Sequence, residues 1–226
     1  MIPLFVKNAI KTIWRDVSVR SETAGRMTML DLAARFVHVG KVRGAYLEFG
    51  VYRGFTFSSA YKSFRRHNSS ISHMWAFDSF DGMPAHTGVD QGAGSFEQAG
   101  QFRCSEEEFV RQLDGYRVPR SDYAVIPGWF DETLTADLAK KVGPAAVVWV
   151  DCDLYSSTVP VLRFIAPLIQ NGTLLVFDDY YCFGGRADLG ERRALEEFLE
   201  SNQELSVTDY AKYGSTGQAF IVNFRR

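Results

Sequence analysis

The sequence lacks both an excess of basic charge and a long uninterrupted apolar run. It carries 25 Lys and Arg against 27 Asp and Glu, which gives a net charge of -2. Proteins that hold a nucleic-acid backbone need clustered positive charge, so we expect no nucleic-acid partner. The first fourteen residues are apolar but interrupted by Lys7 and Lys11. A signal peptide needs an unbroken apolar region, and a membrane span needs a longer one, so we expect neither a leader nor a membrane partner.

Cysteine is also scarce. The three cysteines, Cys104, Cys152 and Cys182, are odd in number and irregularly spaced, and no Cys-x-x-Cys pair occurs. This pattern argues against a disulfide framework and against a structural zinc site. It is typical of a reducing compartment, so we expect a cytoplasmic protein.

What is present is enough apolar sequence for one sizeable domain, which we place at residues 1–226. Apolar residues make up 46% of the chain, and that fraction can bury a continuous core. Apolar strand patterns alternate with helical patterns from residue 45 onward, and the last two strands resemble a hairpin around Gly214–Gly217. The expected strands are 45–50, 72–78, 122–128, 145–151, 173–179, 205–214 and 215–224. This alternation predicts an α/β fold with a doubly wound, mostly parallel, seven-stranded sheet of the Rossmann-like type.

Helical patterns precede and separate these strands. Two of them fall in a helical cap over residues 1–44, the second running from Met27 to Val37 with Ser21 or Thr28 as its N-cap. We expect the first stripe to pack on the domain or on a second subunit of a homodimer; it consists of Ile2, Phe5, Val6, Ala9, Ile10, Ile13 and Trp14. Further helices are expected at 55–66, after Ser105 as N-cap, and at 133–141, 158–170 and 191–202. The polar, Gly-rich residues 79–104 are a candidate lid loop.

The turn after the first strand carries the pattern E-x-G-x-x-x-G. Its glycines let the backbone approach a ligand closely. The turn does not match the dinucleotide-binding pattern G-x-G-x-x-G, because Tyr52 stands at the position of the middle glycine. The pattern therefore suits a ligand without phosphates, such as S-adenosylmethionine, although a merely tight turn would also explain it. The residues of this turn that we assign to cofactor binding are Glu48, Gly50, Val51, Gly54 and Thr56.

Acidic residues follow the next two strands. Asp78 ends the second strand 24 residues after Gly54, where doubly wound folds place a carboxylate on the ribose hydroxyls; a turn-capping aspartate is the alternative. After the third strand, Phe130 and Asp131 begin a segment that could contact adenine. Asp131 could instead cap the following helix, which we prefer.

Four aspartates end the fourth and fifth strands, namely Asp151, Asp153, Asp178 and Asp179. If the two strands are neighbours, these carboxylates converge at one edge of the sheet. Close carboxylates repel unless a cation or protons neutralise them. An all-oxygen set without His or Cys predicts Mg²⁺ or another hard divalent cation rather than zinc. Separate capping of two helices is the alternative.

Five motifs, taken together and in the order in which they occur along the chain, resemble those of the macrocin O-methyltransferase family over roughly residues 20–200. The motifs are LEFGVYRG, FDSFDGMP, PGWFDETL, VDCDLYSST and VFDDYY. The resemblance implies a class I methyltransferase fold that binds S-adenosylmethionine and Mg²⁺ and methylates hydroxyls on sugars of natural products. It places the metal on Asp151, Asp178 and Asp179, with Asp151 also the candidate general base.

The same resemblance places Asp78 on the ribose, and Ser79 and Phe80 along the adenosine pocket. It leaves open whether Asp151 or Asp153 is the base, and it does not define the acceptor, which could also be a catechol. Two further functions compete with it: a non-catalytic nucleoside-binding module, and a metal-dependent hydrolase that uses the same carboxylates.

Overall fold

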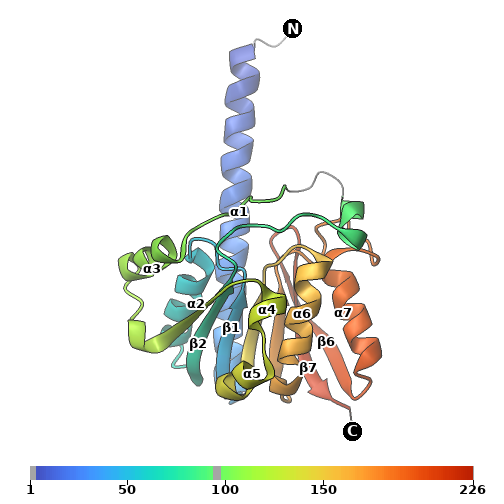
Figure 1. The fold of residues 1–226 in the computed structure, drawn as a ribbon. Coiled ribbons are helices and arrows are strands. Elements are labelled where there is room, and N and C mark those ends of the chain that lie inside the picture. Colours follow the sequence, from blue (N-terminus) through green and yellow to red (C-terminus); the bar gives the residue numbers. More distant parts are fainter. Residues whose placement is uncertain (1–3, 94–97, 226) are drawn as a thin grey trace.

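One seven-stranded sheet in the order β3-β2-β1-β4-β5-β7-β6 organises the protein. The computed structural model describes residues 4–93 and 98–225 (Figure 1). β1 to β5 are parallel, and β7 is antiparallel to both β5 and β6. The strands are β1 Gly44–Phe49, β2 Ile71–Asp78, β3 Tyr123–Pro127, β4 Ala145–Val150, β5 Thr173–Phe177, β6 Leu205–Tyr213 and β7 Gly217–Phe224. The predicted seven-stranded, mostly parallel sheet is confirmed.

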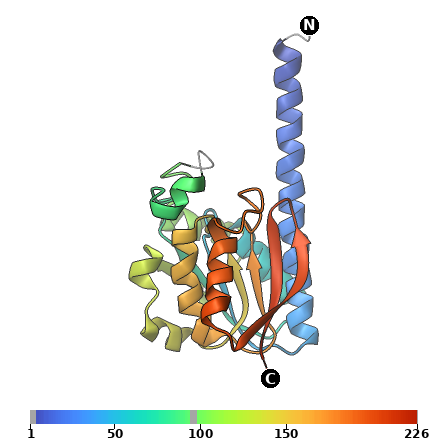
Figure 2. The ribbon, with the colours of Figure 1, turned by 90° about the vertical axis from the view of Figure 1, so that its right-hand side faces the viewer.

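Helices cover both faces of the sheet (Figures 1 and 2). One face carries α1 Leu4–Val39, α2 Phe55–Arg66 and α3 Glu106–Gly115. The opposite face carries α4 Phe130–Thr133, α5 Ala136–Val142, α6 Tyr155–Ile165 and α7 Gly190–Ser201. Three short 3-10 segments complete the described chain: η1 Gly88–Ala93, η2 Arg120–Asp122 and η3 Ala166–Leu168. Within the described residues no helix is both long and apolar enough to cross a membrane.

The central strands β1, β4 and β5 are buried along their whole length because the layers of helices cover both of their faces. All six residues of β1 and all six of β4 are buried. Successive side chains point to opposite faces, so Tyr46 and Trp149 pack under α1 and α2. Their neighbours Leu47 and Val148 pack under α5 and α6. The chain reverses its direction of winding between β1 and β4, which is where ligands bind in such sheets.

The N-terminal region is one continuous helix, so the prediction of two separate helices is wrong. Ser21 and Thr28, the predicted caps, both lie inside α1, and the Thr28 hydroxyl donates to the Ala24 carbonyl. The N-terminal part of α1 extends beyond the sheet and its other helices (Figure 2). The predicted stripe from Ile2 to Trp14 lies outside the residues whose side chains the structure describes.

Two helices after the third strand also differ from the prediction. The expected helix 133–141 begins only at Ala136, as α5, because Thr133 instead ends α4; Thr135 caps α5 by accepting a hydrogen bond from the Leu138 amide at 3.2 Å. Asp131 lies inside α4, whose N-cap is Trp129, so its predicted capping role is wrong. The expected helix 158–170 begins earlier, at Tyr155, and gives way to η3 after Ile165. Ser105 caps α3 as predicted.

Candidate active site

A cavity of about 990 Å³ opens at the carboxyl ends of the parallel strands. Its walls come from the turn after β1, the end of β2, the segment after β3, and the ends of β4 and β5. Seven of the residues predicted for the site line it: Gly50, Asp78, Ser79, Phe130, Asp131, Asp151 and Asp179. The sheet topology thus brings side chains more than 100 residues apart into one site.

The turn after β1 is held in shape by Asp78. One oxygen of the Asp78 carboxylate, Oδ2, accepts hydrogen bonds from the Val51 and Tyr52 amides at 2.8 and 3.1 Å. The other, Oδ1, accepts one from the Phe80 amide at 2.8 Å. Burial outweighs these hydrogen bonds and raises the pKa of Asp78. Asp78 therefore fixes the backbone of the turn, and its Oδ1 retains the capacity to accept a further hydrogen bond.

Glu48 is completely buried beneath this turn and does not line the cavity. The Tyr46 hydroxyl donates a hydrogen bond to its Oε2, while Oε1 has no hydrogen-bond partner among the described residues. Burial raises the pKa of Glu48 well above its usual value, and the hydrogen bond from Tyr46 only partly opposes this. The side chain is enclosed by protein and does not border the cavity, so any effect on a ligand is indirect.

Four other residues predicted for the cofactor do not line the cavity either. Val51 contributes its amide to Asp78. Gly54 is the N-cap of α2, and Thr56 is buried in the first turn of that helix. The ring of Phe80 packs against Phe109 in the core, at a centroid distance of 5.7 Å, rather than on the cavity wall.

Three predicted aspartates meet where β4 and β5 end. Asp151, Asp178 and Asp179 can each present a carboxylate oxygen with all three atoms within 4.8 Å of one another. Burial and the nearby negative charge of Asp178 raise the pKa of Asp151 well above its usual value. Burial, together with Asp153 and Asp178, does the same for the pKa of Asp179. Such a cluster of buried like charges requires a cation or bound protons.

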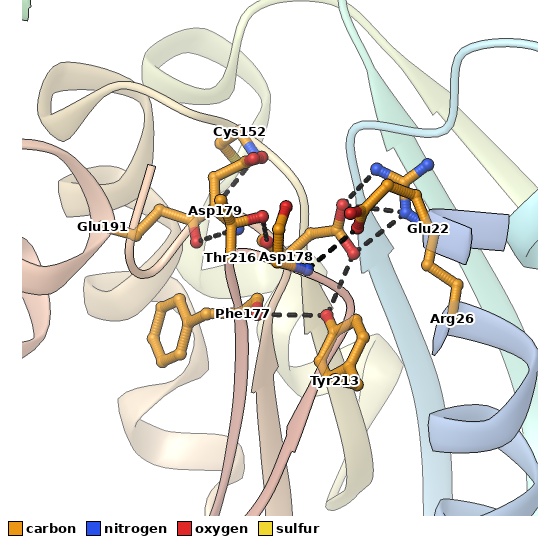
Figure 3. Close-up of polar contacts among 10 residues, drawn as sticks. Glu22, Arg26, Cys152, Phe177, Asp178, Asp179, Glu191, Tyr213 and Thr216 are labelled. Atoms are coloured by element: carbon orange, nitrogen blue, oxygen red, sulfur yellow. Dashed lines mark hydrogen bonds and ion pairs between the residues drawn. The ribbon is translucent and has the colours of Figure 1, made fainter. Parts of the chain in front are cut away.

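Arg26 supplies one positive charge to this cluster from α1 (Figure 3). Its Nε lies 3.0 and 2.8 Å from the two oxygens of Asp178, and its Nη2 also contacts Oδ2. The Tyr213 hydroxyl donates to Asp178 Oδ1 at 3.0 Å. The side chain of Asp178 is only 4% exposed, whereas that of Arg26 is 35% exposed and lines the cavity.

Glu191 fixes the ends of β4 and β5 relative to each other (Figure 3). Its two carboxylate oxygens accept hydrogen bonds from the Cys152 amide at 3.2 Å and the Asp179 amide at 3.0 Å. The side chain is fully buried at the start of α7, and this burial raises the pKa of Glu191 well above its usual value. A single residue from α7 therefore sets the spacing of the aspartate cluster.

The predicted lid is anchored at its centre by Asp90. This residue lies in η1, is 2% exposed, and accepts hydrogen bonds from the Tyr155 and Ser156 amides at 2.9 and 3.1 Å. These amides belong to the first turn of α6, whose own N-cap, Leu154, provides no side-chain hydrogen bond. Residues on both sides of this anchor line the cavity, including Met83 and Phe102. The loop is therefore attached to the wall of the cavity that it covers.

We expect Asp90→Ala to loosen this loop. Loss of a helix N-cap lowers the stability of a protein by about 1–2 kcal/mol. Here the lost hydrogen bonds are the ones that attach the loop to the start of α6. Cleavage by thermolysin between residues 84 and 104, followed by mass spectrometry under native conditions, should become roughly tenfold faster. Thr135→Ala removes a comparable cap from α5 and should leave cleavage of the loop unchanged. Equal cleavage of the Asp90→Ala variant and the unmodified protein would show that Asp90 does not hold the loop.

Three of the residues that build the site were not predicted: Arg26, Asp90 and Glu191. Arg26 does carry a signal, because it lies in line with the buried Leu30, Ala33 and Val37 of its helix. A charged residue in a buried stripe needs a charged or polar partner. The other two show no comparable pattern, since each acts only through contacts with amides far away in the sequence.

Comparison with known proteins identifies relatives of this chain. The family profile of macrocin-O-methyltransferase (TylF) matches residues 14–208. A tetracenomycin-C 4'-O-methyltransferase acting on a dimethoxyrhamnosyl derivative, from Streptomyces olivaceus, is 28% identical over 74% of this chain and 64% of its own length. Demethyldecarbamoylnovobiocin O-methyltransferase from Streptomyces niveus is 33% identical over 62% of this chain and 53% of its own length. The chain thus spans only about half to two thirds of these curated relatives.

Solved structures establish the fold. The O-methyltransferase NovP superposes with a TM-score of 0.75 at 23% identity, covering 89% of this chain and 80% of NovP. The calicheamicin methyltransferase CalS11 gives a TM-score of 0.70 at 21% identity, covering 86% of this chain and 77% of CalS11. The predicted class I methyltransferase fold is confirmed.

Proposed function

The chain belongs to the macrocin-O-methyltransferase family, and from this premise we propose that it transfers a methyl group from S-adenosylmethionine to a hydroxyl of a small molecule with the help of a divalent metal ion. The single observation that carries the proposal is the meeting of Asp151, Asp178 and Asp179 in the cavity region that the Gly50 turn also borders. The proposed acceptor is a sugar or a glycosylated natural product. Relatives from three organisms act on tetracenomycin, novobiocin and mycinamicin precursors.

The cavity has the size and the lining for a nucleoside together with an acceptor. Its volume of about 990 Å³ lies at the upper end of the usual range for ligand sites. The turn at Gly50 and Tyr52 would hold the amino-acid end of the cofactor. Asp78 Oδ1 would accept a hydrogen bond from a hydroxyl of the ribose. Phe130 and Asp131, in the segment after β3 that adjoins the end of β2, would flank the adenine. An O-methyltransferase from Bacillus cereus of related fold, with a TM-score of 0.57, was solved in complex with the demethylated cofactor, SAH.

The aspartate cluster fits a hard divalent cation such as Mg²⁺. All three donors are carboxylates, no His or Cys belongs to this set, and the pKa values of Asp151 and Asp179 are raised by burial next to like charge. Oxygen ligands of this kind favour Mg²⁺, Mn²⁺ or Ca²⁺. When bound, such an ion lowers the pKa of a coordinated hydroxyl, while S-adenosylmethionine provides an electrophilic methyl group.

The protein's own residues then have three tasks. Asp151 accepts the proton of the acceptor hydroxyl: Asp151 and Asp179 both line the cavity, and Asp151 is the one that follows β4, next to β1 and the Gly50 turn proposed for the cofactor. Asp178 and Asp179 hold the cation. The lid and aromatic rings exclude water: Tyr52 and Phe102 meet edge to face at 5.6 Å across the cavity mouth. A dry site favours a step in which the positive charge of the sulfonium disappears.

We expect the demethylated cofactor, S-adenosylhomocysteine, to bind in isothermal titration calorimetry. No heat of binding for it or for S-adenosylmethionine would refute the methyltransferase proposal and would favour the hydrolase, which has no use for this nucleoside. A screen of labelled methyl transfer onto sugars, glycosides and catechols would then identify the acceptor.

Methyl transfer should also depend on the metal. We expect EDTA to abolish it and added Mg²⁺ to restore it, and we expect Asp178→Asn to require far more Mg²⁺ for the same rate. S-Adenosylhomocysteine binding measured in EDTA separates loss of the ion from loss of the cofactor. Full activity after exhaustive chelation would overturn the role that we assign to the cluster.

A further inference from the structure

Arg26 and Tyr213 together engage both carboxylate oxygens of Asp178. A carboxylate oxygen has two lone pairs. Asp178 Oδ1 receives the Arg26 Nε at 3.0 Å and the Tyr213 hydroxyl at 3.0 Å. The same Arg26 Nε–H is shared with Asp178 Oδ2, at 2.8 Å, and Oδ2 also receives a hydrogen bond from the Arg26 Nη2. A cation that binds Asp178 therefore meets the positive charge of Arg26, which contacts both oxygens, and the two like charges repel each other.

Arg26 is the donor that can withdraw. Tyr213 is buried at the end of β6, and its single hydroxyl proton is shared between Asp178 Oδ1 and the Phe177 carbonyl, each 3.0 Å away, so the ring is held by packing as well as by this contact. The side chain of Arg26 is 35% exposed and borders the open cavity, so a released guanidinium can be solvated. A guanidinium that moves from a buried carboxylate into water regains its hydration, and a metal ion that takes its place keeps the carboxylate neutralised. The exchange therefore costs little free energy.

We propose that Arg26 is a built-in cation that competes with the divalent metal for Asp178, so that metal binding displaces the guanidinium from the carboxylate. This inference rests on the proposed function, because it assumes the metal site at Asp151, Asp178 and Asp179. Without the metal, Arg26 offsets part of the repulsion among these carboxylates. With the metal, Arg26 points its charge into the cavity instead.

The backbone of Arg26 is fixed, so the competition involves the side chain alone. One helical turn before it, Glu22 accepts a hydrogen bond from the Ser215 amide in the β6–β7 turn at 3.1 Å. Gly25 packs so closely on Gly214 that a Cβ would overlap its backbone. α1 is thereby attached to the hairpin on which Tyr213 lies, and Arg26 stays within reach of Asp178 in both states.

The first test measures metal affinity without cofactor or acceptor, by Mn²⁺ titration followed by electron paramagnetic resonance of the free ion. Removing the competing charge in Arg26→Gln should tighten Mn²⁺ binding by roughly tenfold or more. Arg26→Lys keeps the charge and should stay within about threefold of the unmodified protein. Arg35→Gln is the matched control: Arg35 is exposed on α1, about 13 Å further along the helix axis, and its loss should leave the affinity unchanged.

The second measurement uses the unmodified protein and does not depend on the folding of the Gln variant. In ¹H–¹⁵N NMR spectra the Nε–H signal of Arg26 can be assigned from its absence in Arg26→Lys. We expect this hydrogen to be protected from exchange with solvent in EDTA and to lose that protection with saturating Mg²⁺. A Gln variant that binds Mn²⁺ with equal or lower affinity, or an Arg26 signal that stays protected with Mg²⁺, overturns the competition. Absence of Mn²⁺ binding in every variant overturns the metal site itself, and with it both proposals.

Discussion

Asp151→Asn is expected to reduce methyl transfer by roughly 10³-fold or more while changing the affinity for S-adenosylhomocysteine by less than about threefold. The amide cannot accept the proton from the acceptor hydroxyl, and loss of a positioned general base alone costs about 10²–10⁴ in rate. Asn has nearly the same shape as Asp. The backbone N–H of residue 151 would still donate a hydrogen bond to the Phe49 carbonyl, which lies 2.9 Å away in the structure. The turn that would hold the cofactor should therefore remain intact.

The comparison with Asp153→Asn decides which aspartate is the base. Asp153 also lines the cavity, and its φ of 57° is a backbone conformation that Asn tolerates well. The Asp153 variant should retain more activity than the Asp151 variant in single-turnover assays with saturating cofactor. The opposite ranking would transfer the role of the base to Asp153. A large loss of cofactor affinity in Asp151→Asn would instead assign Asp151 to the cofactor site.

Loss of the base must be separated from loss of the metal, because Asp151 is proposed for both. Measuring the rate over a range of Mg²⁺ concentrations does this. If the main effect is on metal affinity, high Mg²⁺ should restore the rate, as expected for Asp178→Asn. If Asp151 accepts the proton, the maximal rate should stay low at saturating Mg²⁺.

The centre of the sheet was predictable because β2, β4 and β5 are largely apolar runs that each lead directly into an aspartate. Burial on both faces requires such runs, and parallel strands place their carboxyl ends at one edge. That rule alone brings Asp78, Asp151 and Asp178 to the same cavity region. The roles of these residues were less predictable, since Asp78 uses its carboxylate first of all to fix a turn.

The errors at the helices have a common physical origin in contacts between distant residues. Residues 15–26 are polar and include Gly25, so they resemble a break between two helices. Gly25 lies instead where α1 meets Gly214 so closely that no side chain fits. Similarly, Asp90 stabilises the start of α6 from 65 residues away. Local patterns cannot reveal a cap or a helix-interior glycine whose reason is a partner far along the chain.

Gly50→Ala should have the largest effect on stability, because Gly50 is the point where the turn after β1 touches the end of β4. Its φ is +84°, and a Cβ would overlap the carbonyl oxygen of Asp151. A left-handed alanine costs about 1–2 kcal/mol, and an overlap with main-chain atoms adds about 1–3 kcal/mol because no rotamer change relieves it. We therefore expect a loss of about 3 kcal/mol in urea unfolding, and a loss of cofactor affinity of more than about tenfold, since the turn must move.

Gly184→Ala separates the two causes. Gly184 has a similar φ of +65°, but no atom lies within 4 Å of an added Cβ, so only the backbone cost of about 1–2 kcal/mol should appear. The excess destabilisation of Gly50→Ala over Gly184→Ala then measures the close approach of the two strand ends. Equal urea unfolding midpoints for the Gly50→Ala and Gly184→Ala variants would mean that the turn after β1 can move away from the end of β4 without a cost in stability. The position of Asp151 relative to the cofactor turn would then not be set by the sheet, and the geometry on which the proposed proton transfer depends would have to come from the bound ligands.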